Sequence, residues 1–131
     1  MPKVKRVKIT EGHTRDIKVA PADIRMVMNR PGRALITVTG EGTGPNGVKM
    51  AALRAMDHPL LATHITEAGG VLLRARGGPS MTIDQVESIR DFIWSKQRKV
   101  GADSAIIFFE MEYDENMGDR AQITITATGI P

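Results

Sequence analysis

The order of strand-like and helix-like segments constrains the fold of this chain more than any other feature. Two runs of helical periodicity, at residues 47–58 and from residue 82 onward, each lie between two strand-like runs. The strand-like runs are residues 34–39, 70–75, 104–113 and 122–128. This order predicts a two-layer α+β or α/β domain, in which a four-stranded mixed sheet carries both long helices on one face.

The second helical run has the clearest boundaries. Thr82 and Gln85 have the spacing of a capping box, so we expect the helix to open there. Apolar side chains then recur at helical spacing as far as Ile93, and Gly101 is the expected end. Only residues 114–120 join the last two strand-like runs, which predicts that these two strands pair antiparallel with each other.

The composition is that of an ordinary globular domain. The 131 residues are 41% apolar and 25% charged, which suits a single core. The sequence has no cysteine, so disulfides and thiol chemistry are excluded. No apolar run approaches the ~20 residues of a membrane-spanning helix, and no secretion signal opens the chain. We therefore expect a cytoplasmic protein without membrane insertion.

The positive net charge belongs to a basic N-terminal arm, residues 1–18. Residues 11–131 carry 14 basic and 15 acidic side chains, whereas the first ten residues carry only basic ones. Residues 4–10 and 15–19 are β-prone and flank a glycine, which predicts a hairpin. The arm could contact an anion, or its lysines could protect a sheet edge, and we expect no nucleic-acid binding. The basic side chains are Lys3, Lys5, Arg6 and Lys8.

No arrangement of side chains predicts a catalytic or metal site. The glycine-rich run at residues 40–44 lies between a strand and a helix, where anions can bind. It lacks the Lys-Ser/Thr ending of the common phosphate loop, so we interpret it as a tight turn. The histidines His13, His58 and His64 lack metal-ligand spacing and suit surface or capping roles. We expect no enzyme activity, no cofactor and no bound metal.

Several short motifs occur together in one order. They are GEGTG at 40–44, PLL at 59–61, GVLLRARGG at 70–78, MGD at 117–119 and ATGI at 127–130. In this order and at this spacing, residues 33–131 resemble the C-terminal domain of FtsZ, the bacterial cell-division protein and tubulin relative. The resemblance implies an FtsZ C-terminal-like domain at residues 19–131, after the arm at 1–18. It also implies that the GTP-binding domain, which lies upstream in the family, is missing.

The resemblance extends back through residues 18–28, at the place of the synergy loop. In the family this loop carries an asparagine and two aspartates, and its acidic residues enter the GTP site of the next subunit. Lys18 stands at the asparagine position, Ala20 at the first aspartate and Asp23 at the second. Asp23 would be the one relic of the catalytic set. Because alanine cannot orient a water molecule, we expect poor activation of GTP hydrolysis.

The resemblance implies an assembly or regulatory module of the cell-division filament system. Lys18, Ala20, Asp23 and Arg25 would dock on the GTP face of an FtsZ-type subunit. The domain would then cap the filament, because it offers no GTP face to a further subunit. The alternative is a homo-oligomeric binding module of the same fold without a division role, since fold does not fix function. That module would pair through the N-terminal arm or bind an anionic partner.

Overall fold

The computed structural model describes residues 3–5, 16–98 and 105–131, and five strands form one sheet in the order β1-β4-β3-β5-β2. β4 runs parallel to β1 and β3, whereas β5 runs antiparallel to β3 and β2. The predicted four-stranded mixed sheet is therefore confirmed, and β1 adds a short strand at one edge. The strands are β1 (Lys3–Lys5), β2 (Ala34–Thr43), β3 (Gly70–Gly77), β4 (Ile106–Tyr113) and β5 (Arg120–Ile130).

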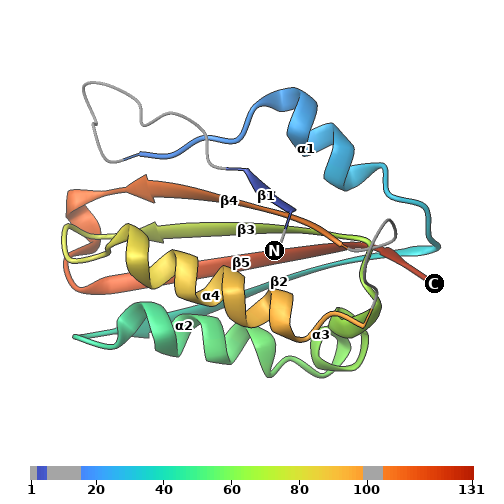
Figure 1. Cartoon of the computed structure of the whole chain (residues 1–131). Coiled ribbons are helices and arrows are strands. Elements are labelled where there is room, and N and C mark those ends of the chain that lie inside the picture. The colour runs from blue at the N-terminus through green and yellow to red at the C-terminus, as the bar shows by residue number, and fades with distance from the viewer. Residues whose placement is uncertain (1–2, 6–15, 99–104) are drawn as a thin grey trace.

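Helices cover the two faces of the sheet unequally (Figure 1). α2 (Gly47–Met56), α3 (Pro59–His64) and α4 (Ile83–Ser95) lie on one face, and η1 (Ile65–Glu67) follows α3. α1 (Pro21–Met28) lies on the other face. The prediction that both long helices share one face is confirmed. None of the helices among the described residues is long and apolar enough to cross a membrane.

Each face of the sheet has its own apolar cluster. The larger cluster lies between the sheet and α2 and α4, and it contains fully buried residues such as Leu73, Phe109 and Ile125. Val27 of α1 belongs to a smaller cluster with Leu72 and Phe108 on the opposite face. Successive residues of β3, such as Leu72 and Leu73, therefore point to different clusters, as the pleat of a strand requires.

Two glycines of β2 allow α2 to lie directly on the strand. A Cβ atom at Gly40 would lie 2.2 Å from the carbonyl oxygen of Ala51, and one at Gly42 would lie 2.2 Å from that of Gly47. These distances are far below van der Waals contact, so side chains at these positions would push the helix away. β2 continues to Thr43, so the interpretation of residues 40–44 as a turn that follows the strand is wrong. α2 fills the space above these glycines.

β4 and β5 do not pair with each other, so the predicted antiparallel pair is wrong. β3 lies between them, and the connection through η3 (Glu115–Met117) passes the end of β3. There the Asp114 N–H donates to the carbonyl of Gly77 at 2.9 Å. β3 is buried at every position except Arg74 and Arg76, which is typical of a central strand. This burial is the physical reason for its place between β4 and β5.

The helix boundaries match the sequence signals at some ends only. The predicted capping box opens α4, with hydrogen bonds of 3.3 Å to the Thr82 hydroxyl and 2.9 Å to the Gln85 carboxamide oxygen. The helix ends at Ser95, earlier than predicted, and Gly101 lies outside the described residues. α3 was not predicted, although Pro59 is a favoured first residue. His58 is the N-cap of this helix, and its Nδ1 accepts from the Leu60 N–H at 3.3 Å.

The described parts of the N-terminal arm pair with β4 rather than with each other. β1 lies parallel to β4, and Ile17 forms an antiparallel bridge with Met111 of the same strand. The described residues do not test the predicted hairpin itself, because its connection and most of its first run lie among residues 6–15. Residues 6–15, which include Arg6 and Lys8, lie outside the described residues.

We expect Gly40→Ala to lower the free energy of unfolding by about 1–3 kcal/mol, because the added methyl group overpacks the contact between β2 and α2. Urea unfolding followed by circular dichroism measures the change. Thr43→Ala, at the exposed end of the same strand, is the control and should shift stability by less than about 0.5 kcal/mol. Equal unfolding midpoints for the two variants would contradict the role assigned to this glycine.

Candidate partner-binding surface

The segment before α1 is fastened along the outer edge of β4. The backbones of Ile17 and Met111 exchange two hydrogen bonds of 2.9 Å each. The Tyr113 N–H donates to Asp16 Oδ1 at 2.8 Å, and the Val19 N–H donates to Glu110 Oε1 at 3.0 Å. Residues 16–19 therefore have a defined backbone path without belonging to a regular strand.

α1 continues from this segment and is anchored to the sheet. Its first residue is Pro21, a favoured position for proline, and Val27 is fully buried below it. The hydroxyl of Thr128, on β5, donates to the Val27 carbonyl at 2.5 Å. These contacts fix the position of α1 over the ends of β3 and β4 and leave the outer side of the helix exposed.

The predicted interface residues lie close together but differ in accessibility. Lys18 and Arg25 are exposed, and Ala20 is half-buried. Asp23 is only 7% exposed, and its N–H donates to the Ala20 carbonyl at 2.9 Å in the first turn of α1. The segment thus presents two cations to solvent and turns its one carboxylate into the fold.

A shallow polar hollow of about 270 Å³ lies beside Lys18 on the same face of the sheet. Arg74 and Arg76 project from β3 toward the acidic side chains of β4, at 3.2 Å for Arg74 and Glu110 and 3.0 Å for Arg76 and Glu112. Lys18 Nζ lies 3.9 Å from Glu112 Oε2. The opposite charges are thus paired across the strands, so the hollow has no strong field of one sign.

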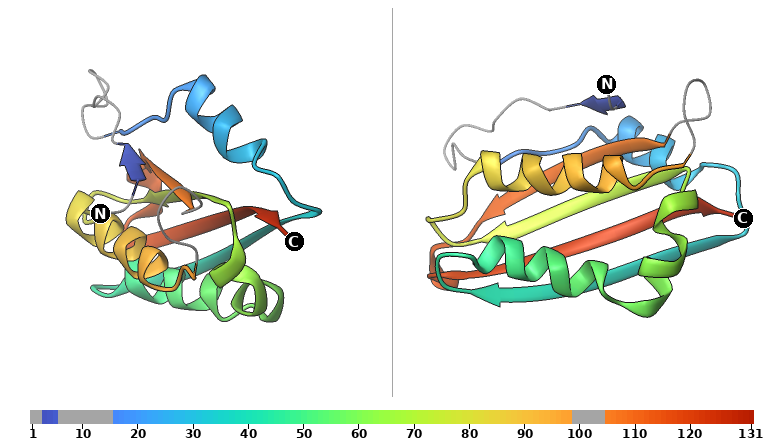
Figure 2. Two further views of the ribbon diagram at one scale, coloured as in Figure 1. Left: turned by 45° about the vertical axis from the view of Figure 1, so that its right-hand side comes forward. Right: turned by 60° about the horizontal axis from the view of Figure 1, so that its bottom comes forward.

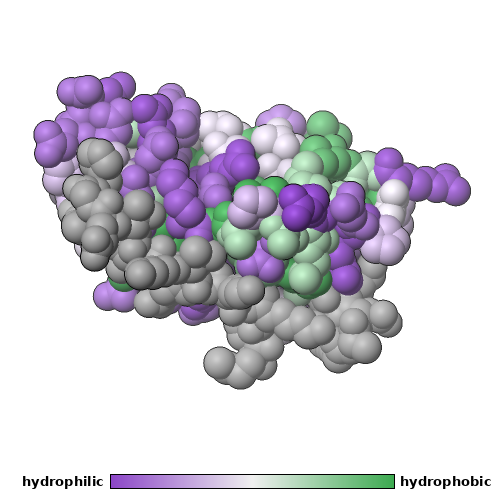
Figure 3. Space-filling view, turned by 90° about the horizontal axis from the view of Figure 1, so that it is seen from above, coloured by the Kyte–Doolittle hydropathy of each residue, from purple (hydrophilic) through white to green (hydrophobic). Residues whose placement is uncertain are grey.

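The polar character of this face extends beyond the hollow. Figure 3 looks onto the face that carries α1 and shows hydrophilic side chains gathered toward the end where β4 runs into η3, with hydrophobic ones nearer α1. Glu110 and Glu112 were not among the predicted interface residues. In the sequence of β3, Arg74 and Arg76 alternate with apolar residues, which indicates that both arginines lie on one face of the sheet. This pattern could have suggested that they lie opposite the acidic residues of β4.

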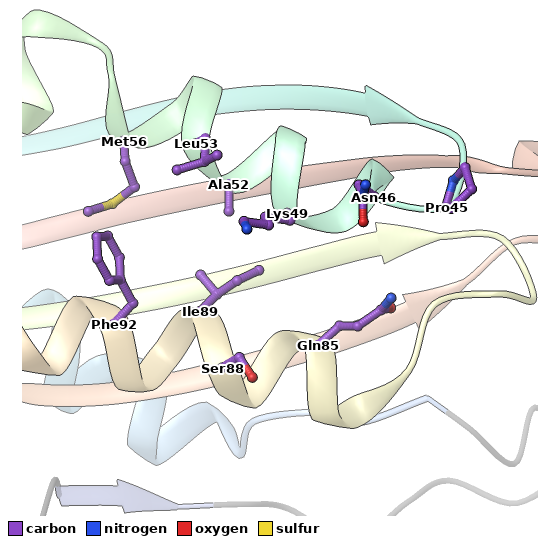
Figure 4. Close-up of a pocket in the computed structure, with 10 residues that line it drawn as sticks. All are labelled: Pro45, Asn46, Lys49, Ala52, Leu53, Met56, Gln85, Ser88, Ile89 and Phe92. Carbon is purple, nitrogen blue, oxygen red and sulfur yellow. The ribbon is translucent and has the colours of Figure 1, made fainter.

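A second hollow lies on the opposite face, between α2 and α4 (Figure 4). It measures about 470 Å³ and is lined mainly by apolar side chains, among them Leu53, Met56 and Phe92, with Lys49 as the charged member of the lining. No catalytic arrangement is present among its lining residues. The structure thus presents two open surfaces of different chemistry, one polar and one apolar.

The structure describes only some of the basic residues that were predicted to contact an anion. Lys3 and Lys5 belong to β1, and Arg6 and Lys8 fall outside the described residues. Among the residues that the structure describes, no group of His, Asp and Glu side chains is arranged to hold a metal ion. Anion binding by the arm stays a prediction.

Comparisons with known proteins match one domain. Residues 32–131 match the family model for the FtsZ family, C-terminal domain. The cell division protein FtsZ of Buchnera aphidicola subsp. Baizongia pistaciae is 36% identical over 110 residues, which are 83% of this chain and 27% of that protein. FtsZ 1 of Archaeoglobus fulgidus is 34% identical over 109 residues, 83% of this chain and 28% of that protein.

Solved structures show the same similarity in three dimensions. An empty FtsZ dimer of M. jannaschii matches with a TM-score of 0.73 and 26% identity, over 86% of this chain and 32% of that one. A TubZ protofilament of Bacillus thuringiensis serovar israelensis matches with a TM-score of 0.60 at 14% identity over 92% and 31%, which shows the fold alone. The chain thus spans about a quarter to a third of the length of these relatives.

We expect Glu110→Ala to release residues 16–19 from β4, because the Glu110 carboxylate accepts the Val19 N–H and also holds Arg74. Losing a hydrogen bond to a charged group should speed amide exchange at Val19 by about tenfold or more. Glu112→Ala is the matched control, since Glu112 pairs with exposed side chains only. Equal exchange rates in both variants, measured by NMR, would show that Glu110 does not hold this segment.

Proposed function

This chain belongs to the FtsZ family as a C-terminal domain, and from that premise we propose that it is a non-catalytic assembly module of the cell-division filament system. In the proposed complex, residues 18–25 dock on the GTP face of an FtsZ-type subunit. The observation that carries the proposal is the presentation of this segment: Glu110 and β4 hold its backbone while Lys18 and Arg25 stay exposed. A segment held in this way loses little conformational entropy when it binds.

The charge of the segment suits a surface that holds a nucleotide. Lys18 and Arg25 are cations, and both can approach phosphate oxygens as donors. The pairing of Lys18 with Glu112 at 3.9 Å joins two half-exposed side chains, so it offers little resistance to a new partner. Docking would exchange this weak contact for one with a phosphate group.

The proposed module binds an FtsZ-type subunit without supporting GTP hydrolysis by that subunit. Ala20 has no side-chain group that could orient an attacking water, and Asp23 would have to leave a buried position to reach a nucleotide in a partner. Removing one such water-orienting group commonly lowers a rate by about two to four orders of magnitude. The expected result of docking is therefore a stalled filament end.

The proposed module would cap a filament because it uses one of the two stacking interfaces and does not offer the other. Subunits that stack head to tail need two different faces, and in the proposed complex residues 18–25 supply one of them. A filament end occupied by residues 1–131 alone would offer the next subunit no GTP face, so growth would stop there.

The alternative function, a homo-oligomeric binding module, is supported by a different observation. β2 has a neighbouring strand on one side only among the described residues, and a free strand edge is a surface for self-pairing. The described part of the arm already pairs with β4 of its own chain, so it offers less support for self-association through the arm.

Sedimentation of a GTP-assembled FtsZ-type protein, titrated with this chain, tests capping. We expect less pelleted polymer at substoichiometric ratios, since one capping molecule stops a whole filament. Lys18→Glu should weaken the effect about tenfold or more, because it places an acid opposite phosphates. Lys49→Glu, a reversal of the same charge on the opposite face, should leave it unchanged.

Unchanged pelleting at a large molar excess of this chain would overturn the proposal. Equal loss of activity in the Lys18 and Lys49 variants would also contradict it, because it would place the contact outside residues 18–25. Circular dichroism of each variant establishes that the fold is intact before the assay.

A further inference from the structure

The hollow between α2 and α4, the α2–α4 hollow, has a polar end and an apolar end. Figure 2 shows the two helices side by side on one face of the sheet. Asn46 and Gln85 lie at one end of the hollow, whereas Met56 and Phe92 lie at the other (Figure 4). Its volume of about 470 Å³ is typical of small-molecule sites, which combine apolar walls with a few polar groups.

The apolar part of the α2–α4 hollow has a closed floor and open walls. Ala52 and Ile89 are buried between the helices, at 6% and 8% exposed, and form the floor. Leu53 and Phe92 line the same space but are 46% and 45% exposed. Exposed apolar side chains that gather in a concave surface are typical of a binding site. A bound hydrocarbon chain would cover both walls.

Three side chains at the polar end carry hydrogen-bond donors that are free to bind a ligand. Within the part of the chain that the structure describes, the Lys49 ammonium has neither an ion pair nor a hydrogen bond. Asn46 is the N-cap of α2, yet its side chain makes no capping hydrogen bond. The Gln85 carboxamide oxygen accepts from the Thr82 N–H at 2.9 Å, which fixes the amide and leaves its NH2 group as a donor.

The surroundings of the polar end favour an anion. Among the described residues, no acidic side chain lines the hollow, and Lys49 is the charged member of the lining. α2 begins at Gly47 and α4 at Ile83, so the two helices direct the positive ends of their dipoles toward the same end. A cation, two amides and two helix starts therefore act together on a ligand placed there.

Two further cations, Arg54 of α2 and Lys96 at the end of α4, already have partners. Arg54 Nη1 donates to the Glu41 carbonyl at 2.7 Å, which directs it toward β2. Lys96 Nζ lies 5.0 Å from the centre of the Phe92 ring and is stabilised by the ring's electrons. Lys49 is therefore the cation that a ligand in the hollow would contact first.

We propose that the α2–α4 hollow binds a small amphipathic carboxylate. The carboxylate would lie at Lys49, and the hydrocarbon chain would run past Leu53 toward Phe92. A carboxylate carries acceptors only, so it suits an end that offers donors from Lys49, Asn46 and Gln85. Burial of the chain against the apolar walls would supply the remaining affinity.

Length and charge define the class of ligand. Lys49 and Met56 are about 10 Å apart along α2, because each helical residue adds ~1.5 Å. This length suits an alkyl chain of medium length. A nucleotide or another polyanion is disfavoured, because the lining offers it one cation among mainly apolar side chains.

The proposed site is independent of the proposed docking on an FtsZ-type subunit. The docking segment lies along the edge of β4 and continues into α1, which is on the opposite face of the sheet. Ligand binding is measured without an FtsZ-type protein, so the failure of either proposal leaves the other intact.

Titration of the ¹⁵N-labelled chain with octanoate below its micelle concentration, followed by NMR, tests the site. We expect saturable shifts confined to residues 45–56 and 85–92. 1-Octanol, which keeps the chain without the charge, should bind about tenfold more weakly, because it forms no charge-assisted hydrogen bond. Acetate, which keeps the charge without the chain, should show no saturable binding.

Two pairs of variants separate the charge from the apolar wall. Lys49→Met should raise the octanoate Kd about tenfold and leave the 1-octanol Kd unchanged. Its matched control, Lys18→Met on the opposite face, should change neither. Leu53→Ser should raise both Kd values about fivefold, because it removes apolar contact. Leu60→Ser is the control, since Leu60 is 56% exposed and lies outside the hollow.

The absence of saturable octanoate binding would overturn the inference. Equal binding of octanoate and 1-octanol would also overturn it, because the polar end would then select no charge. Shifts of equal size in α1 would show adhesion to any apolar surface, with the same consequence. A dimer in sedimentation velocity that Leu53→Ser dissociates would assign the hollow to a second copy instead.

Discussion

The central position of β3 is the constraint on which the rest of the structure depends. β3 pairs along its whole length with β4 on one side and β5 on the other, and it is buried at all positions but Arg74 and Arg76. Because β3 occupies one edge of β4, the other edge is left for residues 16–19 and β1. Because β5 also pairs with β2, β2 is the last strand at that side of the sheet among the described residues. The position of the proposed docking segment therefore follows from one buried strand.

One face of the sheet contributes mainly to stability, and we assign partner recognition to the other face. The face beneath α2 and α4 holds the larger core, and Gly40 and Gly42 bring α2 against the sheet there. The face with α1 has only a small apolar cluster and a wide polar area. Changes on the polar face should therefore affect binding more than stability, since exposed ion pairs contribute little to folding.

The fold was largely predictable from the sequence, because periodicity and capping are local properties. The strand and helix order, the Thr82 and Gln85 cap and the shared face of the long helices needed no tertiary information. Which strands lie side by side did require tertiary information. Residues 114–120 looked like a hairpin connection, but β3 is buried between β4 and β5 and separates them. The glycines of residues 40–44 suggested a turn. Gly40 and Gly42 instead allow α2 to lie close to β2.

The candidate surface was predictable in outline only. The resemblance pointed to residues 18–25, but the burial of Asp23 depends on how α1 packs, and a sequence does not record that. The cross-strand charges beside Lys18 depend on the register of β3 and β4. The interaction itself is tested most directly by amide hydrogen exchange of this chain with and without a GTP-bound FtsZ-type subunit. We expect slower exchange at residues 17–28 and unchanged exchange in α2 and α4. Protection of α2 and α4 instead, or of no segment, would contradict it.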